Sequence, residues 1–312
     1  MDAYNLLDRK ILRPIWRVGP LWNVLVSRQI AWVAFLYDQL FNGKLSVKRT
    51  MKLLPEMRKS LGPECTSYRF SYLNHYYSIL ALFNYGWLLY TRPQHIRDKI
   101  STVKIKGLDN LYNAVKREKA IVAFSAHIGC FFNILFSDSV LSAIDKRGVC
   151  LLVPGTKDSR REQMQAQLSD YGKACQLIDI TKKTSAIRII RALKCRSIIG
   201  CNMDYAYPFT KNRSAPFLGR VVEMPVGILE LSRKYAATYL PAYSYINNDG
   251  IVIEFQEPFD AYCTDNLEND ITWVANKINS LLEEKIKEIP EQWSFWARLL
   301  NAPSVELSEG RI

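Results

Sequence analysis

The chain shows two kinds of hydrophobic pattern. From about residue 102 onwards, short apolar runs rich in β-branched residues alternate with segments of helical periodicity. The runs predicted as strands are residues 102–106, 120–125, 149–153, 176–180, 198–203, 238–246 and 251–256. The predicted helices are residues 108–116, 130–144, 158–172, 185–194, 225–236 and 267–289, and another begins at Pro290. This alternation predicts an α/β fold with a mostly parallel central sheet flanked by helices.

Residues 1–100 are predicted to form helices packed on that sheet. The greasy stretches 21–41 and 76–90 contain polar residues, so neither provides the roughly 20 apolar residues of a transmembrane helix. Tryptophans and basic residues accompany the first stretch. Two interpretations stay open, an interfacial helix on a membrane and helices that only pack on the core. We expect an N-terminal helical segment over 1–100 and an α/β domain over 101–312.

The charge balance indicates an anionic partner. The 312 residues include 42 Lys and Arg against 30 Asp and Glu, a net charge of +12. Such an excess favours a phospholipid surface, a nucleic acid or an acidic carrier protein. The usual nucleic-acid-binding motifs are missing, so we expect no nucleic acid as partner. The seven cysteines show no CxxC spacing and predict no zinc site or disulfide framework.

The most informative segment runs from Ser125 through His127 to Gly129, directly after the apolar run 120–124. The pattern predicts a buried strand that ends in a turn, with a helix starting just after it. Ligands of open α/β sheets bind at the carboxyl ends of strands. Histidine is the side chain best suited to accept a proton near neutral pH, so His127 is a candidate general base. A structural histidine is the alternative.

Several blocks together resemble the late lipid A acyltransferase family, bacterial enzymes that move a fatty acyl chain from acyl carrier protein to a lipid precursor. The blocks are residues 104–111 with 125–129, residues 214–220 with 227–232, and the tail 283–293. The Pro-Glu-Gln-Trp ending of that tail is the most specific match. The resemblance spans roughly residues 65–298. It implies a glycerolipid-acyltransferase-like fold in which His127 is the general base.

The family's motif places Asp or Glu five positions after the histidine, where this chain has Phe132. Phe cannot accept a hydrogen bond from an imidazole, so the orienting partner is missing. Asp204, which follows the run 198–203, is one candidate replacement, although it also fits an ordinary cap or turn. Asn133 is a weaker candidate. Cys130 is a second possibility, because helix amides and a nearby His lower a thiol pKa and would favour an acyl-cysteine, with a small Cys packed in a helix as the alternative.

A third interpretation is an inactive site, which we place behind an active enzyme. The family's arginine on the strand 149–153 is also absent, so the amides of Ile128 and Gly129 are candidate oxyanion donors. Six residues are assigned to substrate binding. Two of them flank His127, and the other four are cations that follow strands or turns. These cations either hold phosphates or form a solvated basic face. The six residues are Ser125, Gly129, Lys157, Arg160, Arg161 and Arg220.

The resulting prediction is an acyltransferase that moves an acyl group from a carrier-protein or CoA thioester to a hydroxyl or amine acceptor. The product would serve lipid or secondary-metabolite assembly, and residues 131–136 would line the acyl chain's tunnel. No metal or redox cofactor is expected, because the donor brings its own phosphopantetheine. We expect a peripheral protein on the cytoplasmic face of the inner membrane. A non-catalytic lipid-binding or assembly subunit of the same fold and an acyl-thioester hydrolase are the alternatives.

Overall fold

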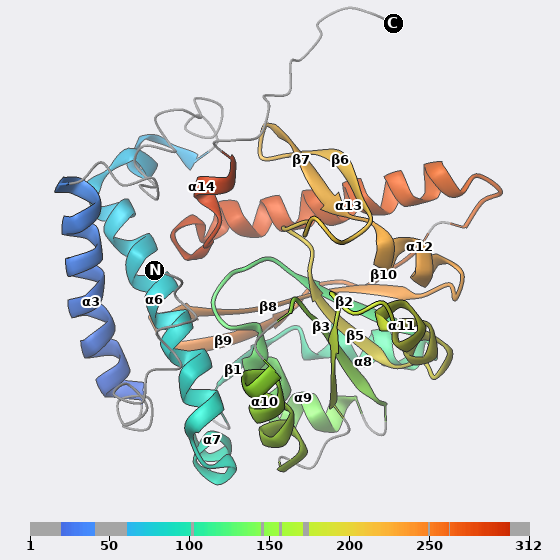
Figure 1. Cartoon of the computed structure of the whole chain (residues 1–312), viewed down its shortest axis with the longest axis horizontal. Helices are drawn as coiled ribbons and strands as arrows, with labels where there is room; N and C mark the ends of the chain where they lie inside the picture. The colour runs from blue at the N-terminus through green and yellow to red at the C-terminus, as the bar shows by residue number, and fades with distance from the viewer. Residues whose placement is uncertain are drawn as a thin grey trace, which may run out of the picture.

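The computed structural model describes residues 20–40, 61–100, 103–144, 147–155, 158–170, 175–248, 250–261 and 263–299 (Figure 1). Its strands are β1 (Lys104–Lys106), β2 (Ile121–Ser125), β3 (Val149–Val153), β4 (Cys175–Asp179), β5 (Ile198–Asn202), β6 (Asn212–Phe217), β7 (Arg220–Pro225), β8 (Thr238–Asn247), β9 (Gly250–Phe255) and β10 (Phe259–Asp260). Its α-helices are α3 (Pro20–Leu40), α6 (Tyr68–Tyr90), α7 (Pro93–Ile100), α8 (Leu108–Lys116), α9 (Asp138–Ala143), α10 (Asp158–Asp170), α11 (Ser185–Lys194), α12 (Gly227–Arg233), α13 (Leu267–Glu288) and α14 (Trp296–Leu299). Three short 3₁₀ helices are η1 (Pro63–Thr66), η2 (Phe131–Phe136) and η3 (Pro290–Gln292).

The central sheet has the strand order β1-β9-β8-β2-β5-β3-β4, and β10 pairs with β8. Strands β8, β2, β5, β3 and β4 run parallel to one another, whereas β9 and β10 run antiparallel to β8. Strand β2 lies inside the sheet and all five of its residues are buried. Its unbroken apolar run reflects this, because both faces of the sheet are covered. The predicted α/β class with a mostly parallel sheet is confirmed.

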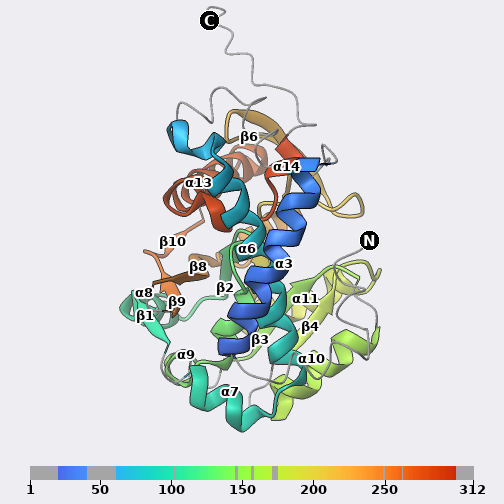
Figure 2. The ribbon, with the colours of Figure 1, turned by 90° about the vertical axis from the view of Figure 1, so that its left-hand side faces the viewer.

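The N-terminal helices stack outward from the sheet. Trp87 and Leu88 of α6 share a buried cluster with Ile121 and Ala123 of β2. Helix α3 packs along the outer side of α6, and Figure 2 shows it in front of that helix. Among the described helices, none combines the length and apolar character needed to cross a bilayer. Residues 1–19 and 41–60, which belong to the expected N-terminal segment, lie outside the described residues.

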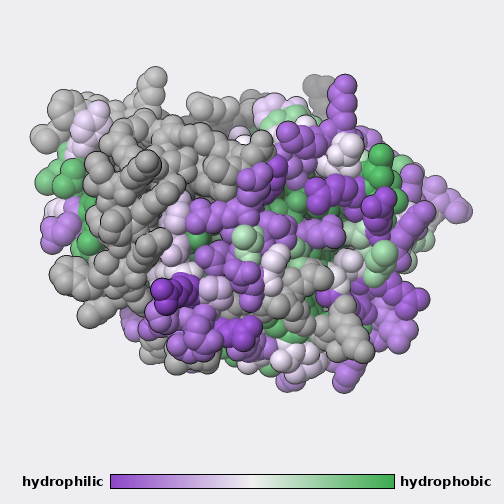
Figure 3. Space-filling model, turned by 60° about the horizontal axis from the view of Figure 1, so that its bottom comes forward, coloured by the Kyte–Doolittle hydropathy of each residue, from purple (hydrophilic) through white to green (hydrophobic). Residues whose placement is uncertain are grey.

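One face of the molecule is largely polar where its residues are described. Figure 3 shows the face that comes forward from the bottom of Figure 1, where hydrophilic side chains spread across the middle and right. Hydrophobic side chains appear there only as separate patches.

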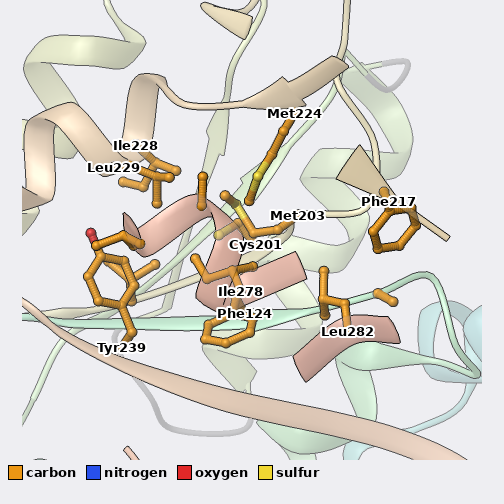
Figure 4. Packing of buried hydrophobic residues seen from close by; sticks show 14 of the residues in the cluster. Phe124, Cys201, Met203, Phe217, Met224, Ile228, Leu229, Tyr239, Ile278 and Leu282 are labelled. Atoms are coloured by element: carbon orange, nitrogen blue, oxygen red, sulfur yellow. The ribbon is translucent and has the colours of Figure 1, made fainter. Parts of the chain in front are cut away.

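The other face of the sheet carries a second buried cluster, in which Val122 and Phe124 of β2 meet α12 and α13. Figure 4 shows its members Phe124, Ile278 and Leu282 close together. Alternate β2 residues therefore point to opposite cores, as the period of two along a strand requires. The β6–β7 hairpin adds Phe217 and Met224 to this cluster.

The β6–β7 hairpin was not predicted from the sequence, and η2 and α9 were predicted as one helix. Residues 212–217 include Asn, Arg, Ser and Pro, which weaken a strand pattern. The single helix predicted over residues 130–144 is wrong: η2 and α9 are separated at Ser137, whose hydroxyl accepts a hydrogen bond from the amide of Val140. The predicted helix 225–236 is shorter, since α12 covers Gly227–Arg233.

Candidate functional site

The register of two parallel strands brings His127 and Asp204 together. Ser125, the last residue of β2, pairs with Asn202, the last residue of β5. The amide of Met203 donates to the carbonyl of Ser125 at 2.9 Å, so the ladder continues past the strand ends. His127 and Asp204 each lie two residues beyond their strand. They therefore face each other at the carboxyl edge of the sheet.

Asp204 accepts three N–H groups. His127 Nδ1 lies 2.7 Å from Oδ1, while the backbone amide of His127 and the indole Nε1 of Trp293 donate to Oδ2 at 2.8 and 2.7 Å. The Asp204 side chain has no exposed surface. Burial alone would raise the pKa of Asp204, but the charge and hydrogen bonds of His127 and the Trp293 donor outweigh it and hold that pKa below its usual value. Asp204 is thus a buried, ionised acceptor.

This arrangement determines which nitrogen of His127 is available. An ionised carboxylate can only accept hydrogen bonds, so Nδ1 of a neutral His127 must carry the proton and Nε2 keeps a lone pair. The imidazole is 24% exposed. Among the described residues, none makes a hydrogen bond to Nε2. The pair can therefore accept a proton at Nε2 and stabilise the resulting imidazolium.

A row of aromatic rings leads from His127 to the surface. The ring centroid of Phe295 lies 4.2 Å from the imidazole, and Tyr205 lies 5.5 Å from Phe295. Tyr207 follows at 4.4 Å and Phe209 at 5.3 Å, where 50% of Phe209 is exposed. We call these four rings the aromatic row. It offers an apolar, partly exposed path that starts at the imidazole.

The turn after His127 depends on a glycine. Gly129 has φ +57°, and a Cβ there would lie 2.2 Å from the carbonyl oxygen of Ser244 on β8. Ile128 uses its amide on the carbonyl of Ala126 at 2.7 Å, so the expectation that this amide serves an oxyanion is wrong. Ser125 is fully buried and its hydroxyl donates to the same carbonyl. Gly129 shapes the turn, and Ser125 has no exposed face toward a ligand.

The residues just after the turn point away from His127. Phe132, at the family's acid position, packs with its ring 5.1 Å from Tyr85 of α6. Asn133 donates to Ser244 and accepts from Asn84, both at 3.0 Å. Burial raises the pKa of the Cys130 thiol to about 12. The expectation of a lowered thiol pKa at Cys130 is therefore wrong.

The structure describes the side chains of two of the predicted cations, Arg161 and Arg220. Arg161 of α10 forms an ion pair with Asp179 at 2.7 Å, at the end of β4, which is three strands away from β2. Arg220 begins β7 and lies opposite Phe217 in the hairpin. Lys157 and the side chain of Arg160 lie outside the described residues. A role of these residues in substrate binding stays a prediction.

Two residues of the site, Trp293 and Phe295, were not assigned to it from sequence. Both belong to the C-terminal tail that η3 begins, and Trp293 forms an isolated bridge with Ile128. The signal was present, since the Pro-Glu-Gln-Trp run was the most specific part of the family resemblance. It did not reveal a role because the tail lies 166 positions or so from His127 in the chain.

Comparison with known proteins identifies the family. No curated protein matches the chain. A family model described as bacterial lipid A biosynthesis acyltransferase matches residues 76–301, well over half of the 312 residues. The match includes His127, Asp204 and Trp293, and it supports the resemblance drawn from the sequence blocks. The chain belongs to the bacterial lipid A biosynthesis acyltransferases, a family whose activity is acyl transfer in lipid biosynthesis.

Proposed function

We propose that His127 is the general base of a transfer from an acyl thioester to a hydroxyl or amine acceptor. Nε2 of His127 takes the acceptor's proton as the acceptor oxygen or nitrogen bonds to the thioester carbonyl carbon. The carbon–sulfur bond then breaks, and the leaving thiolate receives the proton from the imidazolium. Asp204 holds the ring in the Nδ1–H tautomer and stabilises its charged form. The observation that carries this proposal is the 2.7 Å contact between His127 Nδ1 and a fully buried carboxylate.

The donor we propose is a thioester of a carrier protein or of CoA, in lipid or secondary-metabolite assembly. The acceptor must reach Nε2 from the exposed side of the imidazole, where the aromatic row begins. Apolar rings bind hydrocarbon by burying its surface. We therefore place the acyl chain along the aromatic row rather than along η2, whose Ile134, Leu135 and Phe136 are buried in the core.

The test compares two buried acids. Asp204→Asn keeps the shape but removes the charge, so transfer of a labelled acyl chain from acyl carrier protein should fall by about 100-fold or more. Asp270→Asn is the matched control, because Asp270 is also buried (3% exposed) but lies in the first turn of α13 and pairs with Arg233 of α12.

Product analysis separates the rival functions. Labelled acceptor supports acyl transfer. Labelled free acid in its place identifies a thioester hydrolase, and absence of turnover by the wild-type protein identifies a binding subunit. Equal activity of Asp204→Asn and Asp270→Asn would contradict the proposed base.

We further propose that α3 lies on a membrane surface, at the cytoplasmic leaflet of the inner membrane where such donors are supplied. Two of the seven exposed side chains described on this helix, Arg28 and Gln29, are polar. The other five are large and apolar, and their exposed fractions lie between 47 and 68%. They are Leu25, Trp32, Val33, Leu36 and Tyr37. Residues 1–19 carry four Lys or Arg against two Asp, and residues 41–60 carry six against one Glu. An apolar face between basic segments is typical of binding to anionic lipid.

Vesicle binding tests this surface. Val33→Asp with Leu36→Asp should weaken binding to vesicles that contain phosphatidylglycerol, because both side chains lie on the exposed face of α3. Ile187→Asp is the control, since Ile187 is 60% exposed but lies on α11. An equal loss in both variants, or no loss in the first, would contradict the proposed orientation.

A further inference from the structure

The C-terminal tail contacts both members of the His127–Asp204 pair, and we infer that Trp293 is a positioning residue that holds Asp204 in register with the imidazole. The inference rests on the proposed function, since it assigns Trp293 a role in the base's action. It goes beyond that function by extending the site to a segment that no catalytic motif covers.

The two carboxylate oxygens of Asp204 accept hydrogen bonds from different donors. Oδ2 receives two donors from different parts of the chain, the His127 amide at 2.8 Å and the Trp293 indole at 2.7 Å. Oδ1 is then directed at His127 Nδ1. A carboxylate held at one oxygen by two fixed donors cannot rotate without breaking them. Trp293 thereby fixes the plane in which Oδ1 meets the imidazole.

Neighbouring residues of the tail contact His127 itself. The amide of Ser294 donates to the carbonyl of His127 at 3.1 Å, and Trp293 forms a bridge with Ile128. Phe295 places its ring 4.2 Å from the imidazole. Three consecutive residues therefore contact the acid, the main chain and the ring of the same pair.

The tail is also anchored by contacts that do not involve the His127–Asp204 pair. The side-chain amide of Asn74 on α6 donates to the carbonyls of Glu291 and Trp293 at 3.0 and 2.8 Å. Gln292 accepts from the amide of Ile246 on β8 at 3.0 Å and donates to its carbonyl at 2.6 Å. These bonds hold the tail between α6 and β8. Trp293 can therefore position Asp204 instead of merely following it.

Trp296 provides the control for a purely structural role. Both indoles are 1% exposed, and their rings pack 4.7 Å apart. The indole of Trp296 donates to the carbonyl of Pro290 at 2.8 Å and makes no hydrogen bond to the pair among the described residues. Changing either residue to Phe removes one indole N–H and a similar volume from the same cluster. Only the change at Trp293 removes a donor from Asp204.

The experiment compares Trp293→Phe with Trp296→Phe. We expect kcat to fall about tenfold or more in Trp293→Phe with KM nearly unchanged, and to stay within about twofold in Trp296→Phe. Nitrogen-15 NMR of His127 without substrate should show the Nδ1–H tautomer in wild type and Trp296→Phe, and a tautomer mixture in Trp293→Phe. Equal effects of the two changes on kcat and on the tautomer would overturn the inference.

A measurement on proteins that keep Trp293 covers the case in which Trp293→Phe does not fold. The Trp293 indole proton resonance should move when Asp204 becomes Asn, because Asp204 is its hydrogen-bond acceptor. An indole resonance that does not respond to this change would overturn the inference. The proposed function is tested separately, because it fails if Asp204→Asn leaves acyl transfer intact. The tautomer measurement needs no substrate, so its outcome does not depend on that activity.

Discussion

Two buried ionic clusters of this protein share most of their physics and differ in one respect. In the first, Asp204 lies between His127 and Trp293. In the second, Lys285 of α13 donates to both oxygens of Glu254 at 3.0 and 2.9 Å and to Glu288 at 2.8 Å. The Lys285 side chain, like that of Asp204, has no exposed surface. In both clusters, burial opposes ionisation of the central carboxylate, and its partners nevertheless hold its pKa below the usual value.

The difference lies in the unused hydrogen-bonding capacity. All three donors of the Lys285 ammonium have an acceptor, and its charge also lies 4.3 Å from the centre of the Tyr245 ring. The Lys285 cluster is closed and joins α13 to the sheet. Among the residues that the structure describes, none bonds to Nε2 of His127, whose ring is 24% exposed. Burial and a shifted pKa therefore do not identify a site by themselves, since an available atom that faces outward is also needed.

The largest expected effect separates the two clusters by activity. His127→Ala should lower acyl transfer by about 10²–10⁴-fold, because general-base catalysis typically contributes that much. The loss in melting temperature should be modest, since the imidazole is partly exposed and the buried Asp204 keeps the His127 amide and the Trp293 indole as donors. The measurement is turnover of acyl carrier protein loaded with a labelled chain. Near wild-type turnover with normal melting would eliminate His127 as the base.

A change in the Lys285 cluster should act on stability and not on turnover. Lys285→Met removes the buried ammonium partner of Glu254 and leaves it the longer contact with Lys106 at 4.0 Å, so the free energy of unfolding should fall by about 3 kcal/mol. Lys287→Met on the same helix is the control, because Lys287 is exposed and its pair with Glu283 contributes about 0.5 kcal/mol or less. Urea unfolding measures both. Turnover per folded molecule should stay normal in Lys285→Met, and a selective loss of turnover would mean that this cluster also serves the site.

A third test addresses the turn that presents His127. Gly129→Ala should destabilise the fold by about 2–3 kcal/mol, because its Cβ would meet the carbonyl of Ser244 in addition to the cost of a positive φ. Gly62→Ala has φ +81° but no atom within 4 Å of the new Cβ, so about 1 kcal/mol is expected. Thermal unfolding of the two variants isolates the clash. Equal losses would show that the Ser244 contact is relieved by a small shift.

The smallest effect expected is on the pH dependence of stability. The folded pKa of Asp204 is below the 3.8 of an unperturbed aspartate, so its ionised form stabilises the fold above that pH. This contribution is lost as the pH falls through the folded pKa. The difference in unfolding free energy between wild type and Asp204→Asn should therefore be constant above about pH 5 and shrink below pH 3.8. A difference that does not change with pH would contradict an ionised Asp204.

The local pattern of the chain was sufficient for most of the fold. Helices over Leu108–Lys116 and Ser185–Lys194 and the strand Val149–Val153 agree with the prediction at both ends. Their apolar periodicity is strong because each buries one face or both faces in a core. The β6–β7 hairpin escaped prediction, since β6 begins with three polar residues and contains Pro216, and its Phe217 and the Met224 of β7 are buried in a cluster with residues of distant helices.

The sequence by itself determined the α/β class, the family resemblance and the position of His127 at a strand end. Only the tertiary structure decided what faces His127. Asp204 is 77 positions away and reaches it through the parallel pairing of β2 with β5, and Trp293 arrives from a tail held by α6 and β8. The pKa of Cys130 was also settled there, because burial outweighs the nearby amides that the sequence suggested. Strand order and burial arise from contacts between distant segments, which no local pattern of hydrophobic and polar residues contains.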